Sequence, residues 1–176
     1  VNRDVAQHAR LTVRRSRSTR DQYPNSPMGA VALARQAFLD AAWHQRAMQA
    51  VSVDSSLPEP EQNNALDAFV SIADGAQPIV VDTSNELMLL RADRFAREFG
   101  LDLIIRGSGN EYRRLDDVVA TGRAVIVPVS FPKPPNVSHE AAATDVTLES
   151  LMHWDHAPEN PARLTEVGVQ IALTSY

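Results

Sequence analysis

The sequence predicts an α/β fold in which parallel strands alternate with helices. Three short runs rich in valine and isoleucine, at residues 78–82, 101–106 and 123–128, start about 23 residues apart. Between these runs apolar residues recur at helical spacing beside arginine and aspartate, and Gly100 and Gly122 stand where a helix usually ends. Because parallel neighbours need a crossover, we expect strand, helix, strand, helix, strand with right-handed connections.

The three runs are nearly continuous in apolar residues, whereas a half-buried strand alternates apolar with polar ones. This pattern predicts strands that are buried on both faces, as in a parallel sheet. A fourth run, at residues 169–174, extends the sheet, and we expect the four strands to be neighbours in chain order. We therefore assign Ile104 and Ile126 to the core, so that an aspartate at either position should unfold the chain.

Four helices are predicted outside these repeats. The longest, at residues 28–50, follows a Pro-Asn-Ser-Pro turn, and a second is predicted at residues 63–74. Shorter helical patterns occupy residues 147–154 and 158–167. The long helix carries His44, for which a packed or surface role is more common than a role as ligand or base.

The start of the chain differs from the rest in composition. Residues 1–22 are polar and rich in arginine, and we expect them to form an N-terminal arm, helical or irregular, that contacts solvent or another subunit. The remaining residues, 23–176, then form one domain, because 176 residues is an ordinary length for a single domain with its own core.

Composition excludes several classes of function. The chain is 44% hydrophobic and 22% charged, with a net charge of −5 and a pI near 5.5. This balance argues against a nucleic-acid partner, and without cysteine there is no disulfide or thiolate metal site. No membrane span or signal peptide is evident, so we expect a soluble protein with no membrane partner, in the bacterial cytoplasm or periplasm.

The repeats also predict where a site would lie, because ligands of parallel sheets bind beyond the carboxyl ends of the strands. Asp82, Asn85 and Glu111 follow two of those ends. Glu111 belongs to the string GSGNEY, whose glycines and helix start are also found in phosphate-binding turns. The full GxGxxG spacing is missing, so we favour a tight turn and keep a phosphate site as the alternative.

A second group of polar residues lies in the string HWDHAPENP at residues 153–161. It contains His153, Asp155, His156 and Glu159, which are all residue types that bind metals. Their spacing is neither that of a zinc-protease helix nor that of a zinc finger. We therefore favour packing and capping for this string, and keep His153 and His156 as candidate site residues.

Several strings resemble those of an imidazolonepropionase-like branch of the metal-dependent amidohydrolases, the superfamily that also includes dihydroorotases: YPNSPMG, GSGNEY, FPKPP and HWDHAPENP. The resemblance runs from about residue 23 to the end. It implies half of a (β/α)8 barrel of the TIM type, with the strands here as the fifth to eighth and helices preceding them. It also implies a parent fold that hydrolyses C–N bonds in amides or cyclic amides with a zinc-like divalent metal.

The superfamily's metal ligands do not match at the corresponding positions. A histidine after the fifth strand, a histidine after the sixth and an aspartate after the eighth would correspond to Asp82, to Arg106 or Gly107, and to Tyr176. Arginine and glycine cannot replace imidazole, and tyrosine is a poor substitute for aspartate. We therefore expect no cofactor or metal in this chain, with any hydrolase site elsewhere in the parent protein. The alternative is a non-catalytic scaffold or assembly domain.

The ends of the sequence favour a piece of a longer protein, with a complete four-stranded sheet as the alternative. The chain starts with Val1 and stops two residues after the predicted fourth strand. Four strands of a barrel leave open edges and an uncovered sheet face. We therefore expect a homo-oligomer, or the remainder of a longer chain, to cover them.

Overall fold

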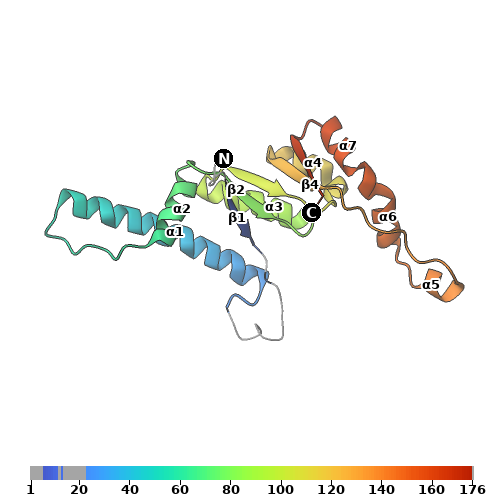
Figure 1. The fold of residues 1–176 in the computed structure, drawn as a ribbon, viewed down its shortest axis with the longest axis horizontal. Coiled ribbons are helices and arrows are strands. Elements are labelled where there is room, and N and C mark those ends of the chain that lie inside the picture. The colour runs from blue at the N-terminus through green and yellow to red at the C-terminus, as the bar shows by residue number, and fades with distance from the viewer. Residues whose placement is uncertain (1–5, 12, 14–22, 176) are drawn as a thin grey trace. The chain divides into compact units, whose positions relative to one another are not determined.

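The computed structural model describes residues 6–11, 13 and 23–175, which form an α/β fold of strands and helices in alternation (Figure 1). In chain order the elements are β1 (Gln7–Arg10), α1 (Pro27–Val53), α2 (Asn64–Ala73), β2 (Ile79–Asp82), α3 (Glu86–Phe99), β3 (Leu103–Arg106), the 3-10 helix η2 (Glu111–Arg114), α4 (Leu115–Thr121), β4 (Ala124–Pro128), α5 (Glu140–Thr144), α6 (Leu148–His156), the 3-10 helix η3 (Ala157–Glu159), α7 (Asn160–Glu166) and β5 (Ile171–Thr174).

The strands form one sheet in chain order, β1-β2-β3-β4-β5. β3 and β4 run parallel with Ile105 opposite Val125, and β4 and β5 run parallel with Val127 opposite Leu173. The prediction that the four apolar runs are neighbouring strands in chain order is confirmed. The helices predicted between and outside the runs are also present, each within a few residues of the expected bounds.

Burial along the strands corrects one prediction. In β3, Leu103 and Ile105 are buried while Ile104 and Arg106 are only half-buried, and β4 alternates in the same way. The expectation of burial on both faces is therefore wrong for these strands, and Ile104 and Ile126 lie on the less buried face. The apolar run could not show this, because isoleucine on both faces conceals the two-residue period of the pleat.

The strand β1 was not predicted. Residues 7–10 were expected to be helical or irregular, yet they pair at the edge of the sheet, where the Gln7 N–H donates to the Pro78 carbonyl at 3.0 Å. The segment QHAR has neither alternation nor β-branched residues to mark it as a strand. The other arginines of the predicted arm, Arg3, Arg14, Arg15, Arg17 and Arg20, lie outside the described residues.

The chain divides into two compact units, Val1–Val81 with Phe95–Asp102, and Asp82–Arg94 with Leu103–Tyr176. In the first unit α1 and α2 lie side by side (Figure 1). Each helix begins at a side-chain cap: the Ser26 hydroxyl accepts from the Gly29 N–H at 3.1 Å, and the Asn63 side-chain oxygen accepts from two N–H groups of the first turn of α2.

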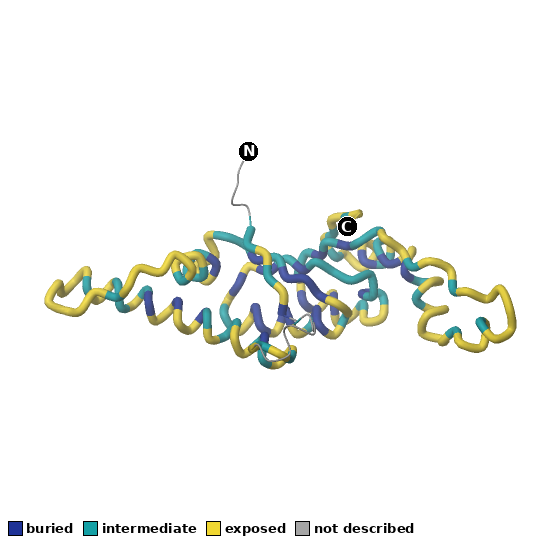
Figure 2. The backbone as a smooth tube through the Cα atoms, turned by 60° about the horizontal axis from the view of Figure 1, so that its bottom comes forward, coloured by how far each residue is buried: buried dark blue, intermediate teal, exposed yellow. Residues whose placement is uncertain are grey.

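Phenylalanine rings form the core of the first unit. Phe38 of α1 is 3% exposed, and its ring centroid lies 5.1 Å from that of Phe69, 5.8 Å from that of Phe95 and 5.1 Å from that of Phe99. Figure 2 shows buried positions at intervals along α1, with exposed positions between them. This spacing is what a helix with a single packed face produces.

In the second unit the strands are joined by short turns and helices. Gly122 ends α4 in the left-handed conformation, with a φ of 66°, as predicted for a glycine at a helix end. Its N–H donates to the Val119 carbonyl. The core includes Ile105, Val127 and Leu164, each 0% exposed. Residues 130–150, by contrast, are mostly exposed (Figure 2). Among the described residues, no helix has both the length and the apolar character that crossing a membrane requires.

Candidate functional site

An ion pair occupies the carboxyl ends of β2 and β3. Asp82 and Arg106 are the last residues of these strands, and the Arg106 guanidinium lies 3.4 Å from the Asp82 carboxylate, with side chains that are 26% and 11% exposed. The hydroxyl of Thr83 donates to the Arg106 carbonyl at 3.0 Å, which ties the residue after β2 to the end of β3. Of the positions that resemblance assigns to metal ligands, the fifth-strand one, Asp82, therefore contacts Arg106, which with Gly107 was proposed for the sixth strand.

Asn85, the next candidate, caps a helix. Its side-chain oxygen accepts from the Met88 N–H at 2.9 Å, and its carbonyl accepts from the Leu89 N–H at 3.1 Å. This is the bonding expected of the residue that precedes α3. The side chain of Asn85 is thus used to start the crossover helix.

Glu111, the third candidate, is completely buried, at 0% exposed. Its carboxylate accepts from the Ser108 N–H at 2.7 Å and from the Gly109 N–H at 3.1 Å. These are the N–H groups that a phosphate would use in a turn of this kind. Since the protein's own carboxylate takes them, the tight-turn interpretation of GSGNEY is supported over the phosphate site.

The residue at the start of GSGNEY is a glycine for a steric reason. A Cβ atom on Gly107 would lie 2.5 Å from Oε1 of Glu111 and 3.2 Å from a methyl group of Val125. A Cβ contact of 2.5 Å essentially never occurs, and one of 3.2 Å is tighter than most. Gly107 therefore gives the buried carboxylate the space that it needs beside β4.

Asn160 completes the environment of Glu111, and sequence reasoning did not single it out. The Asn160 side-chain N–H donates to Oε2 of Glu111 at 2.7 Å, and Asn160 is itself 0% exposed. Its side-chain oxygen is buried without a hydrogen bond to any described residue. GSGNEY and HWDHAPENP, the two unusual strings, thus meet through a buried Glu–Asn contact.

His153 and His156 of α6 pack around one tyrosine. Nδ1 of His153 lies 3.3 Å from the Tyr112 hydroxyl, and the two rings are stacked with centroids 6.1 Å apart. The His156 ring centroid lies 5.7 Å from that of Tyr112. Burial lowers the pKa of His153 below its ordinary value, and the nearby Arg113 cation lowers it further. The lowered pKa favours the neutral ring, and Nδ1 of a neutral ring can accept a hydrogen bond from the tyrosine hydroxyl.

His156 has polar neighbours of its own. Its Nδ1 lies 3.6 Å from the Asp155 carboxylate and 3.4 Å from Nη2 of Arg163, which also binds Glu159 at 2.6 Å. These are contacts within and between consecutive helices, as the packing interpretation of HWDHAPENP predicts. The structure brings His153 and His156 against Tyr112, the residue that follows Glu111 in η2. Asp82 and Asn85 lie after β2, where Asp82 pairs with Arg106 and Asn85 caps α3.

Among the described residues, no group of three or more histidine, aspartate or glutamate side chains is placed to hold a metal ion. Tyr176, the position expected to correspond to the eighth-strand aspartate, lies outside the described residues. At the fifth- and sixth-strand positions a guanidinium, which is always protonated and cannot ligate, already neutralises Asp82. The carboxylate at these strand ends is therefore paired with a cation of the chain itself.

Solved structures reveal what the fold is similar to. The chain matches a crystal structure of an amidohydrolase from Thermotoga maritima MSB8 with a TM-score of 0.71 and 19% sequence identity. The match covers 99% of this chain and 42% of that one, so the chain spans less than half the length of the structure it resembles. The chain shares its fold with that part of the structure. No family model and no curated protein sequence matches it.

Proposed function

We propose that the chain is a segment of an amidohydrolase-like protein whose fold hydrolyses C–N bonds in amides or cyclic amides, and that the segment itself lacks a complete metal site. The fold likeness to the Thermotoga maritima enzyme supports the first part, together with the strings that resemble the imidazolonepropionase-like branch. The order of the strands, β2 to β5, agrees with the second half of such a barrel.

The Asp82–Arg106 ion pair carries the second part of the proposal. A divalent cation placed between these strand ends would meet a guanidinium 3.4 Å from the carboxylate that should bind it. A metal ion bound to this carboxylate would lie close to the guanidinium and be repelled by it, and arginine cannot lose its proton to relieve the repulsion. The metal chemistry of the parent fold would then depend on residues outside these strand ends.

A non-catalytic scaffold or assembly domain is the second candidate. It is favoured by the way polar side chains are used at the strand ends: Asp82 pairs with Arg106, Asn85 caps α3, and Glu111 binds its own turn. Side chains bound within the chain in this way are not available to a substrate. The oligomer expected from the sequence remains a prediction of either candidate.

Zinc binding and amide hydrolysis together test the proposal. In equilibrium dialysis with zinc or manganese, we expect the purified chain to bind less than about 0.1 equivalent. We expect no hydrolysis of hydantoin, a cyclic amide, by the chain alone, and zinc-dependent hydrolysis when it is expressed within its full genomic reading frame. Near-stoichiometric zinc on the chain alone would contradict the second part of the proposal. Inactivity of the full reading frame toward a panel of cyclic amides would favour the scaffold.

A further inference from the structure

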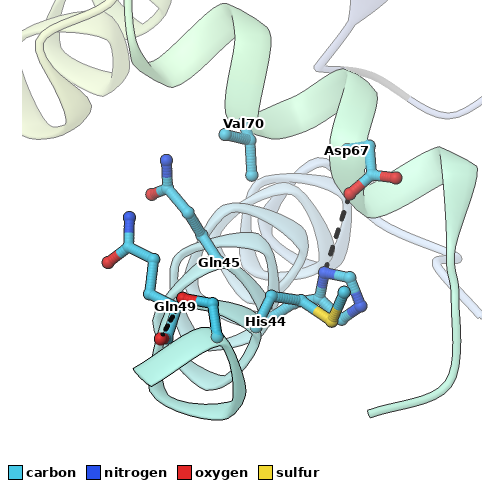
Figure 3. A pocket seen from close by; sticks show the side chains of 7 residues that line it. His44, Gln45, Gln49, Asp67 and Val70 are labelled. Atoms are coloured by element: carbon cyan, nitrogen blue, oxygen red, sulfur yellow. Dashed lines mark hydrogen bonds and ion pairs between the residues drawn. The ribbon is translucent and has the colours of Figure 1, made fainter. Parts of the chain in front are cut away.

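The first compact unit contains an open pocket that the amidohydrolase likeness does not explain. It has a volume of about 410 Å³ and lies between α1 and α2, where His44, Gln49 and Asp67 contribute polar groups and Met48 and Val70 contribute apolar ones (Figure 3). Pockets of this size hold small molecules. The polar groups therefore decide which class of small molecule would fit.

The hydrogen bonding of His44 fixes which of its nitrogens is free. His44 is 4% exposed, and its Nε2 lies 3.1 Å from the Glu61 carbonyl oxygen. A carbonyl only accepts, so Nε2 carries a hydrogen. When the ring carries only that hydrogen, Nδ1 is an acceptor. The packed role expected for this histidine is supported, but one nitrogen remains on the side of the pocket.

That nitrogen faces another acceptor. Nδ1 of His44 and Oδ1 of Asp67 are 3.7 Å apart, beyond hydrogen-bond distance, and Figure 3 shows the imidazole and the carboxylate pointing toward each other. When the ring is protonated the two groups form an ion pair, and when it is neutral both are acceptors and repel each other. A donor placed about 2.9 Å from each of them would relieve the repulsion with two hydrogen bonds.

The charge of the pocket selects the donor. Asp67 is the one carboxylate among the lining residues, its side chain is 64% exposed, and neither arginine nor lysine lines the pocket. We propose that the pocket binds a primary alkylammonium group, with the ammonium donating to Asp67 and to Nδ1 of His44 and the alkyl chain lying against Met48 and Val70. This site is separate in its residues from the proposed amidohydrolase function and does not depend on it.

A titration with n-butylammonium chloride tests the proposal on the full 176-residue chain at pH 8. We expect saturable chemical-shift changes at the His44 imidazole and the Val70 methyl groups, with a dissociation constant on the order of a millimolar. n-Butanol has the same alkyl chain without the charge, and we expect it to bind at least about threefold more weakly. Absence of saturable shifts, or equal binding of the alcohol, would overturn the proposal.

Two matched variants locate the ammonium. Asp67→Asn keeps the shape of the side chain and removes its charge, so we expect n-butylammonium binding to weaken about threefold to tenfold while n-butanol binding is unchanged. Asp40→Asn makes the same change at an exposed carboxylate of α1 that does not line the pocket, and it should leave both ligands unaffected. Equal binding of n-butylammonium to the Asp67→Asn variant and the unmodified chain would exclude the proposed contact.

Discussion

Two carboxylates of this protein contrast in how they are used. Glu111 in the second compact unit is 0% exposed and accepts hydrogen bonds from Ser108, Gly109 and Asn160. Asp67 in the first unit has a side chain that is 64% exposed and faces the His44 imidazole at 3.7 Å. The first carboxylate is bound by the chain, whereas the second retains the capacity to bind something else.

The contrast shows why residue type alone did not identify a site. Glu111 lies beyond a parallel strand, in the place where catalytic residues are usual, yet it serves the fold. Asp67 lies in the first turn of α2, where an acidic residue needs no functional explanation, yet it borders the pocket. Whether the carboxylate oxygens are already hydrogen-bonded within the chain distinguishes Glu111 from Asp67 more clearly than the position of either residue in the fold.

Replacing each carboxylate by alanine should give the largest difference. Glu111→Ala leaves the Ser108 and Gly109 N–H groups and the Asn160 amide without their acceptor in a dry environment, and should lower the free energy of unfolding by about 3 to 5 kcal/mol. Asp67→Ala removes an exposed charge from a helix start and should cost less than about 1 kcal/mol. Urea denaturation of both variants measures the difference, and equal costs would refute the structural role of Glu111.

The glycine beside Glu111 offers a sharper test of the same contact. Gly107→Ala places a methyl group 2.5 Å from Oε1 of Glu111, so we expect a loss of about 1 to 3 kcal/mol in the free energy of unfolding. In the Glu111→Ala background the carboxylate is gone, and the same substitution should cost much less. A double-mutant cycle measures this coupling. Additive costs would mean that the clash involves Val125 or the backbone instead.

A smaller effect concerns the pH dependence of the second unit. Burial and Arg113 lower the pKa of His153 in the folded state, so the unfolded chain binds the proton more readily. The stability contributed by the neutral ring should therefore be present above the ordinary value of 6.5 and decrease as pH falls below it. We expect the difference in unfolding free energy between the unmodified chain and His153→Gln to shrink from pH 8 to pH 5, and a constant difference would contradict this.

Much of the fold follows from local signals in the sequence. The β-branched runs predicted β2, β3, β4 and β5, because strands of a parallel sheet are short and apolar. Gly122 predicted the end of α4, because a helix often ends on a residue in the left-handed conformation. β1 could not be found in this way. Its pairing depends on the edge that the rest of the sheet offers, through contacts such as that of the Gln7 N–H with the Pro78 carbonyl.

The candidate site was harder to predict, because its contacts join distant parts of the sequence. Glu111 was identified from its place after β3, but its partner Asn160 stands 49 residues later and has the sequence context of a helix start. In the same way, the stacking of Tyr112 on His153 depends on how α6 packs, and no spacing within HWDHAPENP indicates it. His44 and Asp67 come together because α1 and α2 lie side by side.

The buried contact of Glu111 also has an evolutionary consequence. Gly107 provides the space for the carboxylate, Asn160 donates to it, and the turn around Ser108 is held by it. A single substitution at any of these positions leaves a clash or an unpaired polar group in a buried environment, while a coordinated change could replace the carboxylate with an apolar side chain. We therefore expect Gly107, Glu111 and Asn160 to vary together among homologous sequences, so that a homologue has either all three residues or none of them.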